Sequence, residues 1–146
     1  MEKPIRVLVI HEEADDRTLI CNLLAAGGCR PLAADSVRDG LRLARLEPPD
    51  LIVMDLAVPD LAGHGLLRGL GRDLRLHHVP VICVTSVDPH RVFPPARSAA
   101  KVGAGRGAAL VILKKPLVTE ELLGRVRALT ASRGKRSARP GGRRGP

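Results

Sequence analysis

The sequence predicts an α/β protein with a doubly wound parallel sheet. Five short apolar runs alternate along the chain with segments whose leucines recur at helical spacing, as in successive strand and helix units. The central run, Leu51-Ile52-Val53-Met54, lies between two Pro-Asp pairs and is apolar throughout, which is typical of a parallel strand covered by helices on both faces. It ends at Asp55. Ligands of open parallel sheets bind at the carboxyl ends of the strands, so this acid lies where chemistry is expected.

The predicted strands are each bounded by polar residues, glycine or proline. The first is followed by an acidic cluster, the second follows a Gly-Gly pair, and the fifth stops at Lys114-Lys115-Pro116. Right-handed crossovers between parallel strands leave few arrangements for such a chain. In chain order the strands are expected at residues 5–10, 30–34, 51–55, 80–84 and 109–113.

Two helices are predicted between the first three strands. The first ends at Gly27-Gly28, because glycine readily adopts the positive φ angle at which many helices end. The second begins at Ser36, a favourable N-cap, with Asp39 in the first turn, where a negative charge favours the helix dipole. It stops before Pro48-Pro49. The apolar stripes of these helices are formed by Leu19, Ile20, Leu23 and Leu24, and by Val37, Leu41, Ala44 and Leu46.

A third helix is predicted after the central strand and a last helix after the fifth strand. The third is weakened by Gly69 and Gly71, each of which costs about 1 kcal/mol relative to alanine. The last has Thr119 as its predicted N-cap, with Glu120 and Glu121 in the first turn. The apolar faces are formed by Leu66, Leu67, Leu70 and Leu74, and by Leu122, Leu123, Val126 and Leu129.

Length and charge indicate one domain followed by a basic tail. The 146 residues suffice for one domain with its own core, and 45% of them are hydrophobic. The net charge is +9, but residues 133–146 hold six basic residues and no acid, whereas residues 1–132 hold 18 basic and 15 acidic residues. We therefore predict a folded domain at residues 1–132 and a disordered tail at residues 133–146. No apolar run approaches the roughly 18 residues of a membrane span, so a cytoplasmic protein is the default expectation.

The basic tail could contact nucleic acid, acidic lipid or an acidic protein through charge alone, or it could serve only to keep the chain in solution. Phe93 is the only Phe, Trp or Tyr of the chain, which excludes a platform for stacking bases. Any contact of the tail with nucleic acid would therefore be weak, sequence-blind and sensitive to salt.

The cysteines and most of the histidines give no sign of a metal site. Three cysteines without CxxC spacing indicate neither a disulfide framework nor a thiolate site, and we expect them to pack as small hydrophobic residues. They are Cys21, Cys29 and Cys83. The histidines without any spacing typical of zinc are expected at the surface, and they are His64, His77, His78 and His90.

Polar residues stand at the ends of four predicted strands. Glu12 follows the first strand and Asp55 ends the third. Thr85 follows the fourth and Lys115 the fifth, so one edge of the sheet gathers acids, a hydroxyl and an ammonium. An aspartate can accept a phosphoryl group and form an acyl phosphate. Lys115 could then pair with the charge of the phosphoryl group, and Thr85 could donate a hydrogen bond to one of its oxygens. Mg²⁺ prefers oxygen ligands, which Glu12, Asp55 and a loop carbonyl such as that of Ala57 could supply.

Across residues 4–131 the sequence resembles the receiver domains of two-component response regulators. An apolar strand followed by an acidic turn begins the match, and the later pieces keep the order and spacing of the family. They are Arg6-Val7-Leu8-Val9-Ile10, Asp55-Leu56-Ala57-Val58-Pro59 with Gly63 beyond it, Val81-Ile82-Cys83-Val84-Thr85-Ser86, and Lys115-Pro116. The resemblance implies a flavodoxin-like strand order of 2-1-3-4-5.

The resemblance also implies a role for each of the strand-end residues. Asp55 would be the phosphoacceptor, and Glu12 and the Ala57 carbonyl would help it to hold Mg²⁺. Thr85 and Lys115 would read the phosphoryl group. The implied donor is a phosphohistidine on a sensor histidine kinase or a phosphotransfer protein, and the implied output is a contact with a partner protein that the sequence does not identify.

Three features depart from the pattern of the family. The acidic pair after the first strand is His11-Glu12 here, so the pocket lacks one negative charge and its affinity for Mg²⁺ is expected to be weaker and sensitive to pH. His11 itself is expected to be a neighbour in the pocket and not a ligand, because Mg²⁺ prefers oxygen. Ile112 takes the place of an aromatic switch residue. The 29 residues between Thr85 and Lys115 are rich in proline and glycine, which favours an irregular fourth helix region.

The function predicted from the sequence is therefore that of a single-domain response regulator that is phosphorylated on Asp55. Such a protein is a signalling switch and not a metabolic enzyme. The alternative is a receiver-like interaction module that acts independently of phosphorylation, which the departures at His11, at Ile112 and in the fourth helix region favour. A third possibility is a small enzyme or nucleotide binder. The absence of a glycine fingerprint after any predicted strand argues against this class.

Overall fold

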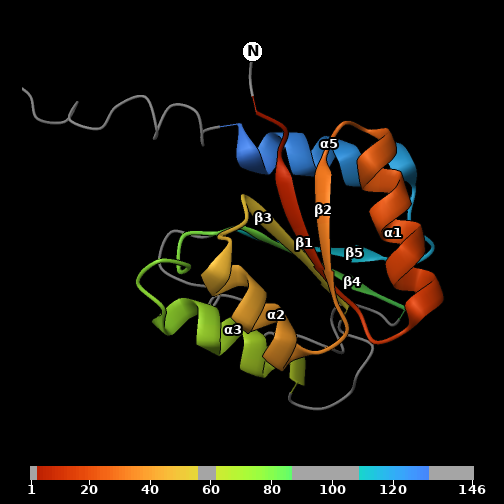
Figure 1. Ribbon diagram of the computed structural model, residues 1–146. Helices are drawn as coiled ribbons and strands as arrows, with labels where there is room; N and C mark the ends of the chain where they lie inside the picture. Colours follow the sequence, from red (N-terminus) through yellow and green to blue (C-terminus); the bar gives the residue numbers. More distant parts are fainter. Residues whose placement is uncertain (1–2, 56–61, 87–108, 132–146) are drawn as a thin grey trace, which may run out of the picture.

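The computed structural model describes residues 3–55, 62–86 and 109–131. Its strands are all parallel and form one sheet in the order β2-β1-β3-β4-β5, with β3 in the middle (Figure 1). The doubly wound sheet and the flavodoxin-like strand order are therefore confirmed. The strands are β1 Arg6–Ile10, β2 Arg30–Ala34, β3 Leu51–Asp55, β4 Val81–Thr85 and β5 Leu110–Lys114.

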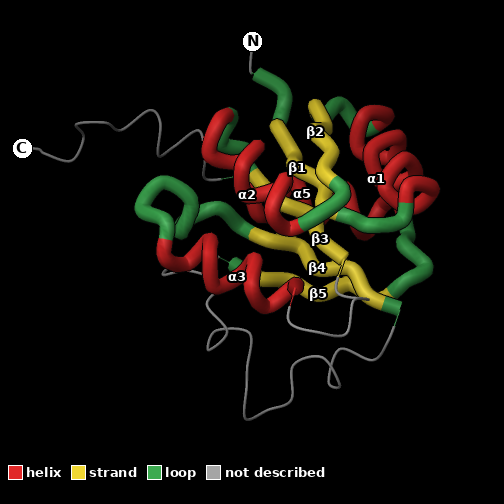
Figure 2. Tube along the Cα trace, turned by 60° about the horizontal axis from the view of Figure 1, so that its bottom comes forward, coloured by secondary structure: helices red, strands yellow, loops and turns green. Residues whose placement is uncertain are grey.

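Helices cover both faces of the sheet, as two apolar faces require. Helices α1 and α5 pack on one face, and α2 and α3 lie side by side on the other (Figures 1 and 2). The helices of the described residues are α1 Ala14–Ala26, α2 Val37–Leu46, α3 Ala62–Arg72 and α5 Thr119–Thr130. None of these four has the length and apolar character needed to cross a membrane.

The core consists of two apolar layers, one on each face of the sheet. Successive residues of a strand point to opposite faces, so β1 directs Leu8 toward α2 and α3 and Val9 toward α1 and α5. In β3, Ile52 and Val53 divide in the same way, and all four side chains are fully buried. The apolar run of β3 is continuous because neither of its faces meets water.

The ends of the first two helices follow the predicted signals. Gly28 lies just beyond the end of α1 and has a φ angle of 90°, which a residue with a Cβ rarely adopts. Ser36 is the N-cap of α2, and its Oγ accepts a hydrogen bond of 3.1 Å from the backbone N–H of Asp39. Helix α2 then ends at Leu46, ahead of the two prolines.

The predicted cap of the last helix is wrong by one residue. Thr119 is the first residue of α5, and Val118 takes the N-cap position in an extended conformation without a side-chain cap. The carbonyl of Val118 accepts a hydrogen bond of 2.9 Å from the N–H of Leu122, so the first helical turn begins there. Glu120 and Glu121 still lie in the first turn, where their charges favour the helix dipole.

Three leucines assigned to apolar faces are exposed instead, namely Leu19, Leu46 and Leu74. Leu74 lies beyond the end of α3 at Arg72, because the carboxylate of Asp73 accepts a hydrogen bond of 2.8 Å from the N–H of Arg75 and favours a turn over a further helical turn. Leu46 is the last residue of α2 and is 71% exposed. Helical spacing alone does not show where a helix leaves the sheet.

The cysteines behave largely as predicted, and the histidines less so. None of the three cysteines forms a disulfide; Cys83 is buried in β4 and the other two are half-buried. Burial, together with the nearby charge of Asp55, raises the pKa of the Cys83 thiol far above its usual range. His78 is exposed as expected, whereas His77 is half-buried.

Some predictions fall on residues outside the described ranges. These are the role of the Ala57 carbonyl, the exposure of His90, the irregular fourth helix region after residue 86, and the tail at residues 133–146 with its boundary at residue 132. The side chain of His64 belongs to the same group. They remain predictions.

Candidate functional site

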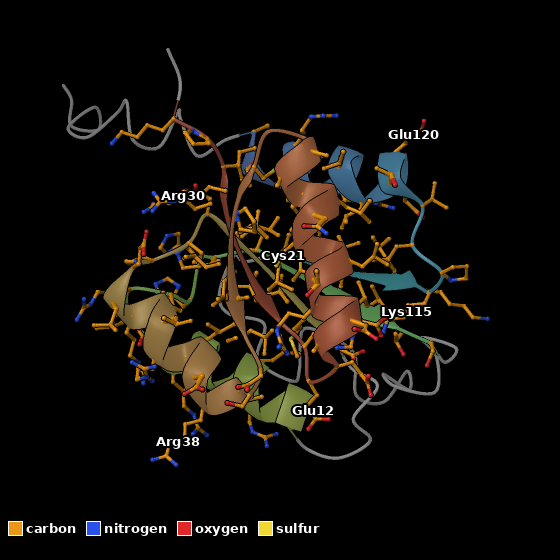
Figure 3. All side chains as sticks on the ribbon, turned by 45° about the vertical axis from the view of Figure 1, so that its right-hand side comes forward. Glu12, Cys21, Arg30, Arg38, Lys115 and Glu120 are labelled. Carbon is orange, nitrogen blue, oxygen red and sulfur yellow. The ribbon has the colours of Figure 1, made fainter. Side chains whose placement is uncertain are left out.

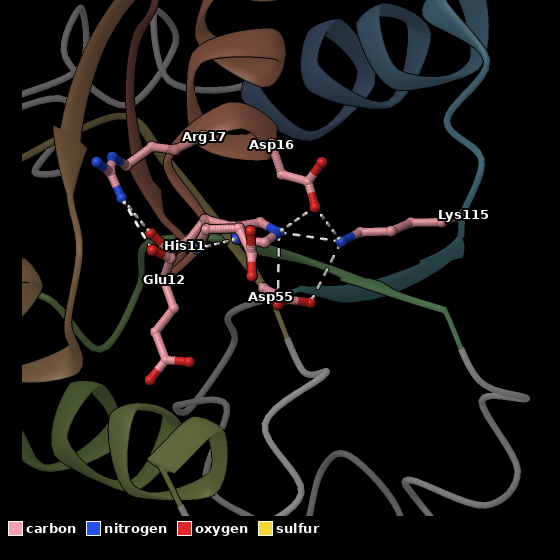
Figure 4. A network of polar contacts seen from close by, with 7 residues as sticks. His11, Glu12, Asp16, Arg17, Asp55 and Lys115 are labelled. Atoms are coloured by element: carbon pink, nitrogen blue, oxygen red, sulfur yellow. Dashed lines mark hydrogen bonds and ion pairs between the residues drawn. The ribbon is translucent and has the colours of Figure 1, made fainter.

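The carboxyl ends of the central strands bring together most of the residues singled out in the sequence. His11 directly follows β1, Asp55 ends β3, Thr85 ends β4, and Lys115 directly follows β5. The backbone N–H of Lys115 donates a hydrogen bond of 2.7 Å to the carbonyl of Thr85, which holds the end of β5 against the end of β4. The predicted gathering at one edge of the sheet is thus present for Asp55, Thr85 and Lys115, and Figure 4 shows Asp55 and Lys115 beside His11.

Asp55 is a nearly buried carboxylate that faces two nitrogen atoms. Its side chain is 6% exposed. Oδ2 lies 3.4 Å from Nε2 of His11, and Oδ1 lies 3.7 Å from Nζ of Lys115. A carboxylate at this depth needs such partners, because its charge would otherwise be strongly unfavourable away from water.

His11 lies at the centre of the site and is more than a packing residue. Its ring is almost completely buried, and Nδ1 accepts a hydrogen bond of 3.1 Å from the backbone N–H of Glu13. Burial lowers the pKa of His11, with Lys115 acting in the same direction and Asp55 and Asp16 opposing it. A neutral ring whose Nδ1 accepts a hydrogen bond carries its proton on Nε2, the atom that faces Asp55 at 3.4 Å and Asp16 at 3.6 Å.

With the proton on Nε2, the close approach of Lys115 to His11 is a contact between two donors and not a hydrogen bond. Nζ of Lys115 lies 3.0 Å from Nε2 of His11, but an ammonium can donate only to a nitrogen with a free lone pair. Nε2 has none while Nδ1 accepts from Glu13. The ammonium is therefore held by carboxylates, at 3.4 Å from Oδ2 of Asp16 and 3.7 Å from Oδ1 of Asp55.

Asp16 is a member of the site that the sequence reasoning missed. Its Oδ2 contacts Nζ of Lys115 and lies 3.6 Å from Nε2 of His11, and the side chain is about half exposed. The residue belongs to the first turn of α1, four residues after the predicted ligand Glu12. An acid in the first helical turn after a strand that ends at the site is the signal that could have found it.

Arg17 is a second residue that was missed, and it shapes the turn after β1. Its Nη1 donates hydrogen bonds to the carbonyls of His11, at 2.7 Å, and Glu12, at 3.3 Å. These bonds fix the backbone that places the imidazole beside Asp55, and they stabilise the start of α1.

Glu12 is not brought to Asp55 in this structure. Its side chain is exposed and points away from the cluster, toward α3 (Figure 4). In the part of the chain that the structure describes, no three His, Cys, Asp or Glu side chains are arranged to hold a metal ion. The carboxylates of Asp55 and Glu12 therefore both lie near this edge of the sheet without being assembled into a metal site.

Comparison with known proteins identifies the family of the chain. The sequence matches the family described as the response regulator receiver domain over residues 7–127. It is 32% identical over 126 residues to Protein PilH of Pseudomonas aeruginosa, an overlap that covers 86% of this chain and 98% of PilH.

Solved receiver domains have the same fold. The signal receiver domain of a signal transduction histidine kinase from Syntrophus aciditrophicus has a TM-score of 0.71 at 25% identity, over 87% of this chain and 90% of that one. The receiver domain of the sensor histidine kinase PA1611 from Pseudomonas aeruginosa, solved with a magnesium ion in its active site cleft, has a TM-score of 0.72 at 21% identity, over 89% and 100%. The chain thus belongs to the response regulator receiver domains, which are signalling domains of two-component systems and not classical enzymes.

Proposed function

We propose that the chain is a single-domain response regulator whose Asp55 accepts a phosphoryl group from the phosphohistidine of a sensor kinase or a phosphotransfer protein. The N–P bond of the donor breaks as an O–P bond forms to the Asp55 carboxylate. The acyl phosphate then changes the contacts of the domain with an output protein. The overlap with nearly the whole of PilH supports the single-domain part of the proposal.

The observation that carries this proposal is the pairing of the buried Asp55 carboxylate with the ammonium of Lys115 at the carboxyl edge of the sheet. A phosphoryl group on Asp55 brings negative charge to a site where a cation already stands. The half-buried Lys115 would pair with that charge. The hydroxyl of Thr85, at the end of the neighbouring strand, would donate to a phosphoryl oxygen.

Mg²⁺ fits the chemistry of the donor set. Asp55, Glu12 and the carbonyl of Ala57 would hold it, since the ion prefers a few carboxylate or carbonyl oxygens and keeps several waters. Glu12 has an exposed side chain with three rotatable bonds, so it is free to turn toward Asp55. When bound, the ion would neutralise charge on the transferred phosphoryl group. The magnesium in the cleft of the PA1611 receiver domain supports this assignment by analogy of fold.

A second candidate function is a receiver-like interaction module that works without phosphorylation. The observation that favours it is that both oxygens of Asp55 already face nitrogen atoms, Nε2 of His11 and Nζ of Lys115. Ile112 adds to it, because an aliphatic residue in β5 offers no aromatic ring to bury or expose.

Incubation with a small acyl-phosphate donor, with and without Mg²⁺, distinguishes the two candidates. Intact mass should show one phosphoryl group on the wild-type protein in the presence of Mg²⁺ and none on the Asp55→Asn variant. His11→Asp, which restores the missing acid, should incorporate the group faster. If the wild-type protein gains no phosphoryl group from this donor or from a phosphorylated histidine protein at any pH from 6 to 8.5, the phosphorylation-independent module is the better account.

A further inference from the structure

Helices α2 and α3 and the turn at residues 73–78 carry an unusual concentration of exposed arginines, which we call the arginine surface. The two helices touch where a Cβ at Gly69 would lie 3.3 Å from a methyl group of Leu41, so their outer faces form one continuous surface. Six arginines share it with only two acids, Asp39 and Asp73. The arginines, all exposed, are Arg38, Arg42, Arg45, Arg68, Arg72 and Arg75.

The spacing of these arginines places them in stripes along the two helices. Arg38, Arg42 and Arg45 recur at intervals of four and three residues and so form one stripe along α2, and Arg68 and Arg72 form another along α3. Both acids of the surface are already engaged: Asp39 lies 3.9 Å from Arg42, and Asp73 binds Nε of Arg45 at 3.1 Å. Among the described residues, Arg38, Arg68 and Arg72 have no carboxylate within ion-pair distance.

The opposite helical layer is nearly neutral. Helices α1 and α5 hold four acids and three arginines. Figure 3 shows the two layers, with Arg38 on the outer side of α2 and Glu120 at the far side of the molecule on α5. The positive charge of the arginine surface is therefore a property of one helical layer and not of the whole domain.

Two exposed leucines belong to the same surface. Leu46 is 71% exposed and Leu74 is 80% exposed. Leu46 directly follows Arg45, and Leu74 directly follows Asp73. Nε of Arg45 donates a hydrogen bond to Oδ2 of Asp73, which joins the end of α2 to the turn after α3. Apolar side chains next to guanidinium groups are typical of surfaces that bind protein.

We propose that the arginine surface docks an acidic protein segment that carries apolar side chains. Carboxylates of the segment would pair with Arg38, Arg68 and Arg72, and its apolar side chains would cover Leu46 and Leu74. A nucleic acid would satisfy the arginines but would leave the leucines in water. The α1 and α5 layer of a second copy is a poorer occupant, because it holds three arginines beside its four acids.

Amide spectra of the ¹⁵N-labelled full-length protein test the proposal. The probe is a synthetic helical peptide of glutamate and leucine, with leucines at i, i+3, i+4 and i+7. The comparison ligands are the same peptide with glutamine in place of leucine and a short DNA duplex. The variant Arg38→Glu/Arg68→Glu reverses two charges of the arginine surface. Arg125→Glu/Arg127→Glu reverses two exposed charges on α5 and is the matched control.

The proposal predicts that the leucine peptide shifts the amides of α2, α3 and residues 73–78 and binds more tightly than either comparison ligand. Affinity should fall with added salt and should be roughly tenfold weaker in Arg38→Glu/Arg68→Glu than in the control. Shifts confined to residues 132–146 or to α1 and α5, equal loss in both variants, or tighter binding of the DNA would overturn it. Self-association of the protein that competes with the peptide would assign the surface to a second copy instead.

Discussion

Nε2 of His11 and Oδ2 of Asp55 lie 3.4 Å apart, and Nε2 carries the proton of the neutral imidazole because Nδ1 accepts a hydrogen bond from the N–H of Glu13. A ring nitrogen thus stands where the resemblance to receiver domains leads one to expect the first of two acids. The pocket keeps a partner for Asp55 but loses one of the charges that would attract a dication. This substitution determines how the site is expected to differ from a receiver with the usual acidic pair.

The variant His11→Asp should bind Mg²⁺ about five times more tightly than the wild-type protein, since a net gain of about 1 kcal/mol is a modest part of the attraction between a carboxylate and a dication. Calorimetry or a titration followed by amide shifts measures the affinity. The exposed His78→Asp makes the same change in charge away from the site and should leave the affinity unchanged. Equal affinity in His11→Asp and wild type would show that the imidazole does not limit metal binding.

Asp16 should weaken the binding of anions at the site, because its carboxylate competes with them for the ammonium of Lys115. Replacing it with asparagine removes that charge at constant shape, so affinity for a fluoroberyllate analogue of the phosphoryl group should rise and affinity for Mg²⁺ should fall, each about two- to fivefold. Asp15→Asn removes one exposed charge from the same turn of α1 and is the control. If both variants respond alike, the effect is one of net charge only.

Asp73 should stabilise the protein in a manner that depends on pH. Hydrogen bonds from the N–H of Arg75 and from the side chain of Arg45 hold the pKa of Asp73 below its usual range. A carboxyl whose pKa is lowered by folding contributes stability above its unfolded pKa and loses it as the pH falls through the folded pKa.

The substitution Asp73→Asn should therefore lower the free energy of unfolding by about 1 kcal/mol at pH 7, and the difference from wild type should shrink below about pH 4. Urea denaturation followed by circular dichroism measures it. The exposed Asp35→Asn should change stability little at either pH. If the stability difference between Asp73→Asn and wild type is the same in acid as at pH 7, the turn does not depend on the charge of Asp73.

Replacing Gly40 and Gly124 with alanine should change the free energy of unfolding in opposite directions. A Cβ at Gly40 in α2 would overlap Cδ1 of the buried Ile10, so Gly40→Ala forces a side chain of the core to move. The variant should lower the free energy of unfolding by about 1 to 2 kcal/mol, even after the gain in helix propensity. Nothing lies within 4 Å of the corresponding position at Gly124 in α5. Gly124→Ala should therefore stabilise by about 0.5 to 1 kcal/mol. Thermal unfolding of both variants decides the point, and equal shifts would contradict the packing of α2 against β1.

The strands could be predicted within one residue because the buried strands β1, β3 and β4 leave unbroken apolar runs, and a Gly-Gly pair precedes the edge strand β2. Residues 30–34 and 51–55 were predicted with the bounds that the structure has, and the other strands begin or end one residue later. The helix ends that were wrong depend on contacts that spacing does not encode. Asp73 holds a turn that keeps Leu74 out of α3, and the chain after β5 starts α5 at the carbonyl of Val118.

The site could be predicted in part for the same reason. Asp55, Thr85 and Lys115 end or follow strands, so the topology alone places them at one edge. Asp16 comes from a helix, and its approach to Lys115 depends on how α1 is turned against the sheet. Glu12 sits beside the correct strand end, but its side chain points away from Asp55, which the backbone position does not reveal.

The most direct test of the account is the position of the phosphoryl group. After reaction of the wild-type protein with an acyl-phosphate donor and Mg²⁺, borohydride reduction converts an aspartyl phosphate to homoserine, and tandem mass spectrometry locates that residue. The account predicts homoserine at position 55 alone, and none when Mg²⁺ is omitted. A phosphoryl group found on His11, or labelling that persists in Asp55→Asn, would contradict the assignment of Asp55 as the phosphoacceptor.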